Sequence, residues 1–288
     1  MVLRGILGKM ARICRMLLCL WAMTLPFQAF AQSEDVLSLL QSGWQAYERK
    51  DLRQAIQDYQ QVLNRVPQDA RLWYDLGCLY TLNHDLANAQ QSWNQALALN
   101  PRSAQVHDAL GQLLEQQADG SGAQIHYATA TELEPGNAAY LWHRIRNRLY
   151  LKKFSEARSD LQRLLMLDPN HVEGHYALGV LTLQNNAPDL AILEFRKTID
   201  LAPNHVLALN GLGLAYIRIR EFEQAAEVLQ KADRLDPWNA RTESNLGILA
   251  ASQQQWEKAR QAWEQALKES PQFEPASRNL KILDGLMK

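Results

Sequence analysis

The chain has 288 residues, of which 47% are hydrophobic and 21% are charged, a composition typical of a folded protein rather than a disordered one. Its formal charge is −1, and four basic residues without any acid in the first 31 positions leave −5 for residues 32–288. Such a chain lacks the clustered Lys and Arg that displace counterions from nucleic acid, so no nucleic-acid partner is expected.

The start of the chain has the three parts of a secretory signal peptide. A basic stretch ends at Arg15, an apolar run extends from Met16 to Met23, and the small residues Ala29 and Ala31 fit a cleavage site. The apolar run is too short to cross about 30 Å of hydrocarbon, which needs about 20 residues. We therefore expect cleavage after Ala31 and a periplasmic or secreted protein. An uncleaved N-terminus anchored in the inner membrane is the less favoured alternative.

A period of 34 residues dominates the rest of the chain. Alanines and glycines recur at this interval, the glycine series being interrupted at Ile145, and so do seven prolines: Pro67, Pro101, Pro135, Pro169, Pro203, Pro237 and Pro271. Apolar residues within each period recur at helical spacing, which predicts two amphipathic helices per period. Each proline stops the second helix, because it cannot continue a helix.

The second period resembles the tetratricopeptide repeat, on the residues Trp73, Leu76, Gly77, Tyr80, Ala89, Trp93, Ala96 and Pro101. The resemblance implies an all-α fold, a right-handed superhelical solenoid of helix pairs with a concave surface. The expected organisation is a signal peptide (1–31), a short N-terminal lead (32–35), seven repeats (36–69, 70–103, 104–137, 138–171, 172–205, 206–239 and 240–273) and a C-terminal capping helix (274–288).

Two repeats depart from the pattern. In the third, Gly120-Ser121-Gly122 stands where the second helix should begin, and each glycine lowers helix propensity by up to about 1 kcal/mol. We therefore expect this segment to be loose. In the fourth, Ile145 replaces the small residue and shifts the apolar stripe around the helix, which predicts altered packing.

The resemblance also implies where a partner would bind. In this family the concave face is lined by the second, fifth, sixth, ninth, twelfth and thirteenth residues of each repeat. The fifth, sixth and ninth positions give the predicted partner-binding residues Tyr74, Asp75, Asp108, Gln112, Trp142, His143, Arg146, Tyr176, Asn210 and Asn245. Aromatic rings beside amides and charges suit an extended peptide. The alternative is that several of these side chains fill the seam between adjacent first helices.

His171 and His175 have the i, i+4 spacing of a pair of zinc ligands. The turn that contains His171 recurs one period later at His205, however, and His175 takes the position that Trp73 fills as a packing residue. No metal site and no cofactor are therefore expected. The chain also lacks a nucleophile elbow, a phosphate-binding glycine loop and a kinase motif set, so no enzyme activity is expected.

The sequence thus predicts an exported tetratricopeptide repeat protein that acts as a protein–protein interaction scaffold or assembly factor in the cell envelope. Its expected partners are envelope proteins or peptides, and no transmembrane span should remain after signal cleavage. Two alternatives belong to other classes. One is a homo-oligomeric structural component, and the other is an accessory protein for envelope polysaccharide binding or export.

Overall fold

The structure is a computed structural model that describes residues 34–286, and the predicted signal peptide lies outside these residues. Within the described part of the chain there are fifteen helices and no strand, which confirms the all-α fold of stacked helix pairs. The chain divides into two compact units, one ending at Leu151 and the other beginning at Lys152.

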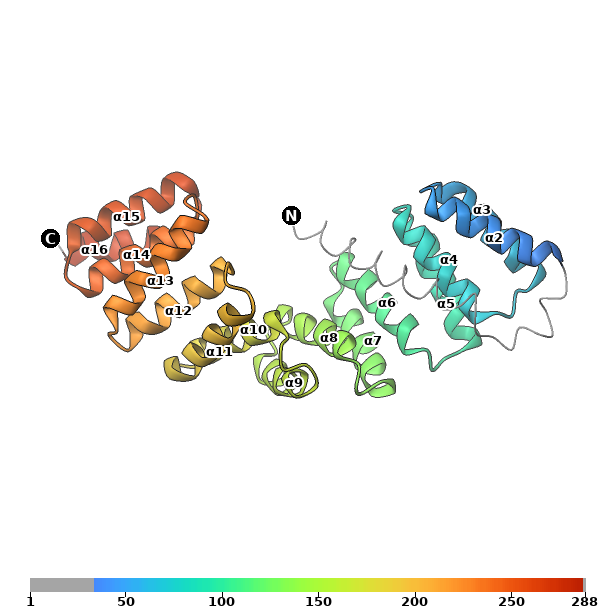
Figure 1. Cartoon of the computed structure of the whole chain (residues 1–288), viewed down its shortest axis with the longest axis horizontal. Coiled ribbons are helices and arrows are strands. Elements are labelled where there is room, and N and C mark those ends of the chain that lie inside the picture. The colour runs from blue at the N-terminus through green and yellow to red at the C-terminus, as the bar shows by residue number, and fades with distance from the viewer. Residues whose placement is uncertain (1–33, 287–288) are drawn as a thin grey trace. The chain divides into compact units, whose positions relative to one another are not determined.

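In each unit, successive helices pack as antiparallel neighbours along the chain, with α4 beside α5 and α14 beside α15 (Figure 1). The first unit contains α2 (Glu34–Glu48), α3 (Leu52–Arg65), α4 (Ala70–Leu82), α5 (Leu86–Leu99), α6 (Ala104–Gln116), α7 (Gly120–Leu133) and α8 (Ala138–Tyr150). The second contains α9 (Phe154–Leu167), α10 (Val172–Gln184), α11 (Pro188–Leu201), α12 (Val206–Arg218), α13 (Phe222–Leu235), α14 (Ala240–Ser252), α15 (Trp256–Glu269) and α16 (Glu274–Leu286).

A glycine on the first helix of most repeats faces a large side chain of the second helix. A Cβ built on Gly179 would lie 2.7 Å from Cε1 of Phe195, which is fully buried. The same pairing joins Gly111 to Tyr127 and Gly213 to Leu229. The small residue therefore lets the two helices approach, and each of these buried side chains contributes about 1.5–3 kcal/mol.

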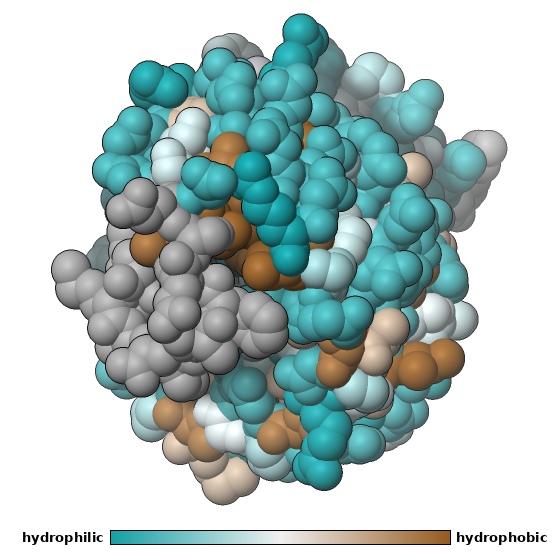
Figure 2. All heavy atoms as spheres, turned by 90° about the vertical axis from the view of Figure 1, so that its right-hand side faces the viewer, coloured by the Kyte–Doolittle hydropathy of each residue, from teal (hydrophilic) through white to brown (hydrophobic). Residues whose placement is uncertain are grey.

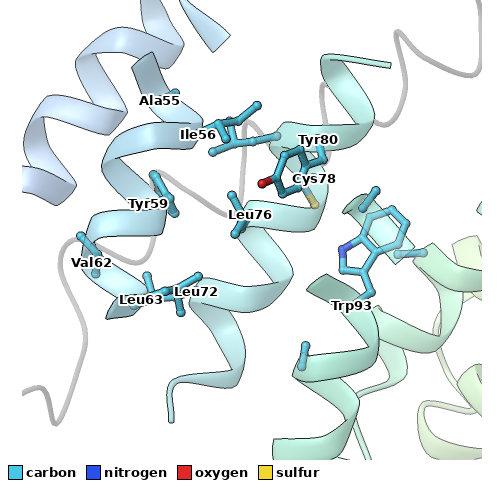
Figure 3. Close-up of a cluster of buried hydrophobic side chains, with 14 of the residues drawn as sticks. Ala55, Ile56, Tyr59, Val62, Leu63, Leu72, Leu76, Cys78, Tyr80 and Trp93 are labelled. Atoms are coloured by element: carbon cyan, nitrogen blue, oxygen red, sulfur yellow. The ribbon is translucent and has the colours of Figure 1, made fainter. Parts of the chain in front are cut away.

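Consecutive repeats share the apolar core. Figure 3 shows Tyr59 and Leu63 of α3 turned toward Leu72 and Leu76 of α4, with Trp93 of α5 on the far side of α4. All five side chains are at most 6% exposed. The core thus continues from one helix pair to the next, which a single pair could not bury alone.

The glycine series is broken where the two units meet in sequence. Ile145 takes the glycine position on α8 and is fully buried, and Leu161 takes the aromatic position on α9. Because α8 belongs to the first unit and α9 to the second, the boundary falls inside the fourth repeat. The fourth repeat, which lacks the glycine, is therefore the repeat whose two helices belong to different units.

The expected loosening at the glycine pair of the third repeat is not found. Helix α7 begins at Gly120, and the Asp119 carboxylate accepts a hydrogen bond of 2.8 Å from the Gly122 amide. The Gly120 carbonyl accepts another from Nδ2 of Asn147 on α8. The capping carboxylate and the contact with α8 compensate for the low helix propensity of glycine.

The turn between the two helices of each repeat contains one residue with a left-handed backbone. These residues are Lys50, His84, Ala118, Lys152, Asn186, Arg220 and Gln254, with φ between 56° and 65°. After six of these residues, all except Lys152, the next amide donates to a carbonyl five residues earlier, as Asp119 does to Leu114 at 2.8 Å. This is the hydrogen bond of a Schellman motif. None of the seven is glycine, although this conformation costs other residues about 1–2 kcal/mol.

The C-terminal helix α16 covers the last repeat. Ala276 and Leu283 are buried against the core of α14 and α15, and Arg260 of α15 forms a 2.7 Å ion pair with Asp284. The last two residues of the expected capping helix (274–288), Met287 and Lys288, lie outside the described residues. The face shown in Figure 2, seen from the side on which Figure 1 draws α2 and α3, is mostly hydrophilic, with hydrophobic side chains in small areas.

The glycine position gives a first test of the packing. We expect Gly179→Ala to destabilise the protein by about 1–2 kcal/mol, because displacing Phe195 outweighs the better helix propensity of alanine. Gly136→Ala is the control, since a Cβ there meets nothing within 4 Å. It should leave stability unchanged or raise it by less than about 1 kcal/mol. Thermal unfolding measures both, and an equal response of the two variants would contradict the packing argument.

The left-handed residues give a second test. Ala118 is exposed and has φ 61°, so Ala118→Gly should stabilise the protein by about 0.5–1 kcal/mol through relief of backbone strain. Asn186→Gly should gain much less, because asparagine tolerates this conformation. A circular-dichroism melting curve of each variant makes the comparison. A lower midpoint for Ala118→Gly would show that the strain is absent.

Candidate functional site

The first helices of consecutive repeats bring equivalent positions together. Nδ1 of His143 on α8 lies 2.7 Å from Oδ1 of Asp108 on α6, although the two residues are 35 positions apart. Nη2 of Arg146 and Oε2 of Glu115 are also 2.7 Å apart across the same two helices. We call the side chains of α2, α4, α6 and α8 the first-helix face of the first unit, and those of α10, α12 and α14 the first-helix face of the second.

The predicted residues of the third and fourth repeats form one polar network. Gln112 donates to Oδ2 of Asp108 at 2.6 Å, while His143 contacts Oδ1 of the same carboxylate. Asp108 is only 6% exposed, and the ring of His143 lies 6.0 Å from that of Tyr127. Asp108 is therefore held inside the seam between α6 and α8, whereas Gln112 and Arg146 keep partly exposed side chains.

The two predicted asparagines of the second unit also bind each other. Nδ2 of Asn245 donates to Oδ1 of Asn210 at 2.8 Å, and Nδ2 of Asn210 donates to Oγ1 of Thr242 at 2.9 Å. Asn210 and Asn245 are 1% and 4% exposed. As with Asp108, their place corresponds to the alternative that the sequence left open, a seam between adjacent first helices. Satisfied hydrogen bonds in a buried seam fix the spacing of the helices.

Two predicted aromatic residues, Tyr74 and Tyr176, are partly exposed and pack against rings of the second helices. Tyr74 stacks on Trp93 with ring centroids 6.5 Å apart, and the Trp93 indole donates to the Tyr74 carbonyl. Tyr176 lies 6.1 Å from Phe195 and 5.0 Å from His205. Trp142 on α8 is likewise partly exposed. Packing on one side already restricts the rotation of each ring. Binding a partner on the exposed side therefore costs little further side-chain entropy.

His171 and His175 perform separate structural tasks. Nδ1 of His171 accepts a hydrogen bond of 3.0 Å from the Gly174 amide and caps α10. His175 contacts the Pro169 carbonyl through Nε2, as Trp73 contacts the carbonyl of Pro67, which confirms the shared packing role. Between residues 34 and 286, no three metal-ligating side chains are grouped as a metal site would require.

Sequence reasoning missed an aromatic pocket between α2 and α4. We call it the α2/α4 pocket; its cavity of about 10 Å³ has room for about one water molecule. It is lined by Trp44, Tyr47, Tyr59, Asp75, Cys78, Leu79 and Leu82. Trp44 and Tyr47 are the ninth and twelfth residues of the first repeat. The ninth position, which selected Gln112 and Arg146, would also have selected Trp44, whereas Tyr47 stands at the twelfth position, from which no residue was selected.

Asp75, one of the predicted residues, supplies the single carboxylate of the α2/α4 pocket. The pKa of Asp75 is raised to about 7, mainly by burial and then by the charge of the nearby Asp69, while Arg71 one turn earlier acts to lower it. The pKa of the Tyr59 hydroxyl is also raised, by burial and then by the charge of Asp75. The carboxylate thus stands in surroundings that stabilise its charge poorly.

Family models described as tetratricopeptide repeat match residues 37–69, 70–103, 143–206, 194–240 and 240–273, more than half of the chain. The chain belongs to the tetratricopeptide repeat family. Residues 104–142 lie outside these matches, although α6 and α7 of this tetratricopeptide repeat protein form the same kind of helix pair. Among curated proteins, no sequence match was found.

Solved structures of other tetratricopeptide repeat proteins share the fold. A protein from Parabacteroides merdae aligns with a TM-score of 0.60 at 17% identity, covering 87% of this chain and 99% of its own. Pseudomonas aeruginosa PilF aligns with a TM-score of 0.60 at 21% identity, covering 74% and 96%. YrrB, described as having an unusual peptide-binding site, aligns with a TM-score of 0.55 at 20% identity, covering 66% and 97%.

The described residues contain no helix that is both long and apolar enough to span a membrane.

The raised pKa of Asp75 predicts how stability depends on pH. The folded state keeps the Asp75 proton up to about pH 7, whereas the unfolded chain loses it near pH 4. The free energy of unfolding therefore falls as pH rises between these values. Asp75→Asn should be more stable than the wild type at pH 8 by about 2–4 kcal/mol and nearly equal to it at pH 4.

Urea unfolding at the two pH values measures this difference. Asp35→Asn removes an exposed carboxylate from the same unit and serves as the control. A stability difference between Asp75→Asn and wild type that is the same at pH 4 and pH 8 would show that the carboxyl group is not perturbed.

Proposed function

We propose that this tetratricopeptide repeat protein is a non-catalytic scaffold of the cell envelope that binds a segment of a partner protein on its first-helix faces. The observation that carries the proposal is the contact between positions one repeat apart, as in the Asp108–His143 pair. It aligns equivalent residues of successive first helices into a continuous row within a unit. Repeat proteins use such rows as extended binding surfaces.

The side chains on these faces divide into two kinds. The buried Asp108, Asn210 and Asn245 are bonded to neighbouring first helices, so they hold the spacing of the row. The partly exposed side chains can contact a partner: Tyr74, Gln112, Trp142, Arg146 and Tyr176. Rings supply buried area to such a contact, while amides and charges bind the backbone and side chains of the segment.

Arg146 favours a partner segment with an acidic group. Its guanidinium is about one-third exposed and already pairs with Glu115, which orients it. An acidic side chain or a terminal carboxylate of a partner could bind the free side of this guanidinium in addition. The adjacent partly exposed Trp142 would supply apolar contact at the same place.

Export is part of the proposal. The basic stretch, the short apolar run and the small residues at Ala29 and Ala31 support a cleaved signal peptide and a periplasmic or secreted protein. The partners would then be envelope proteins or peptides. The peptide-binding site described for the structurally similar YrrB is consistent with a peptide-binding role, although the likeness establishes the fold alone.

Crosslinking and capture from an envelope extract tests the function. Wild-type protein should recover a defined partner, and the combined change of Trp142, Arg146 and Tyr176 to Ala should reduce recovery at least about tenfold, because each removes a partly exposed contact. Trp238→Ala is the control, since Trp238 is 74% exposed and lies in a turn outside the first-helix faces.

The thermal midpoint of the triple variant must stay close to that of the wild type for the comparison to hold. Undiminished recovery by a folded triple variant would contradict the first-helix faces as the binding surface. Light scattering of the same samples separates partner binding from self-association. A stable homo-oligomer that recovers no partner would favour the structural alternative.

A further inference from the structure

Two histidines face each other across the helix pair of the third repeat. Nδ1 of His107 on α6 and Nδ1 of His126 on α7 are 3.0 Å apart, and the ring centroids are 5.2 Å apart. Nε2 of His107 lies 3.2 Å from the carbonyl oxygen of Pro101. Both histidines are partly exposed, so they can exchange protons with solvent.

These contacts determine where the protons of the pair lie. A carbonyl oxygen can only accept a hydrogen bond, so Nε2 of His107 carries a proton. In the neutral ring, Nδ1 of His107 is then bare and accepts, which makes Nδ1 of His126 the donor. His126 can donate whether or not its own Nε2 is protonated. A proton on Nδ1 of His107 would instead set two N–H groups against each other, so the intact contact holds at most one positive charge.

The fifth repeat has a different pair at the same place. Two periods after His107 and His126 stand His175 on α10 and Glu194 on α11. Nε2 of His175 contacts the Pro169 carbonyl at 3.0 Å, and its Nδ1 lies 2.7 Å from Oε2 of Glu194. A carboxylate accepts hydrogen bonds, so a proton on Nδ1 of His175 serves this contact. An added proton therefore opposes the contact in the third repeat and maintains the one in the fifth.

The acidic side chains of α6 are engaged by other partners. Asp108 contacts His143 of α8, and Glu115 contacts Arg146 of the same helix. Helix α5, which packs against α6 on the other side, has no ionisable side chain. These helices therefore offer no carboxylate that is ready to compensate a second proton on the histidine pair.

The other charges near the pair are exposed or directed elsewhere. Glu132 of α7 and Arg102 in the turn before α6 are exposed, and Arg144 of α8 donates to Thr131. Burial lowers the pKa of His126, and the charge of His107 also lowers it, with no contribution from another charged group of the described chain. The two histidines thus respond to acid as a coupled pair.

We propose that His107 and His126 form a pH-sensitive contact, which a second proton breaks so that α6 loosens from α7, while α10 and α11 stay packed. Below the ordinary histidine pKa of about 6.5, both side chains are protonated in the unfolded chain, whereas the folded pair accepts one added proton. The unfolded state then binds one proton more, so the free energy of unfolding falls as pH falls below this value. The equilibrium constant for opening the third repeat should rise by up to about tenfold per pH unit. This inference goes beyond the proposed function and does not depend on it.

Hydrogen exchange of the full chain, followed by mass spectrometry at pH 7 and pH 5, measures the opening of each helix pair. Protection factors remove the pH dependence of the exchange chemistry itself. Peptides from α6 and α7 should lose at least about fivefold in protection between the two pH values, and peptides from α10 and α11 less than about twofold. An equal loss in the two repeats, or no loss in either, would overturn the proposal.

Variants show whether the facing imidazoles are responsible. The amide of His126→Gln can donate to His107 or accept from it, so α6 and α7 of this variant should lose less than about twofold in protection. Glu194→His places a histidine pair in the fifth repeat and should make α10 and α11 sensitive to acid, whereas the control Glu194→Gln should not. An undiminished acid response in His126→Gln, with a thermal midpoint at pH 7 like that of the wild type, would contradict the proposal.

Nuclear magnetic resonance of the imidazole C–H groups counts the protons directly in the wild type. His107 and His126 should take up two protons in separate steps, the second below about pH 5. Two histidines that both titrate at about pH 6.5 in the folded protein would overturn the proposal, whatever the variants do.

Discussion

The close approach of two helices over a glycine determines the rest of this structure. Phe195 fills the space that a side chain at Gly179 would occupy, and equivalent pairs recur in most repeats. With the helices so close, the alanines and leucines around each pair can be completely buried. The first helices then stand at a constant spacing along each unit, and that spacing brings residues about 35 positions apart into contact.

Much of the fold was predictable because the period is carried by residues with a direct steric role. Glycine at 77 or 179 and proline at 169 or 203 are needed for helix contact and helix termination, so they mark each repeat. The left-handed turn residues were not predictable, because Lys152 and Arg220 carry no sign of that conformation. The continuity of α7 was also missed, since it depends on Asp119 and on a contact from α8.

The candidate site was predictable in position but not in exposure. The fifth, sixth and ninth residues of each repeat do lie on the first helices. Position in the repeat does not determine, however, whether a side chain is exposed to solvent or packs against the adjacent first helix. Asn210 and Asn245 can be buried because they form a hydrogen bond with each other across the seam. Trp44 was overlooked for a different reason. It stands at the ninth position of the first repeat, and that repeat was not searched for binding residues.

The ring of Phe195 has a second neighbour, because a Cβ on Gly211 of the following repeat would also collide with it. One side chain is therefore wedged between two glycines that belong to different repeats. If either repeat unfolds, Phe195 loses the packing contacts on that side. The other repeat is then destabilised as well. The fifth and sixth repeats are thus coupled as neighbours in a linear array are, so order in one propagates to the other.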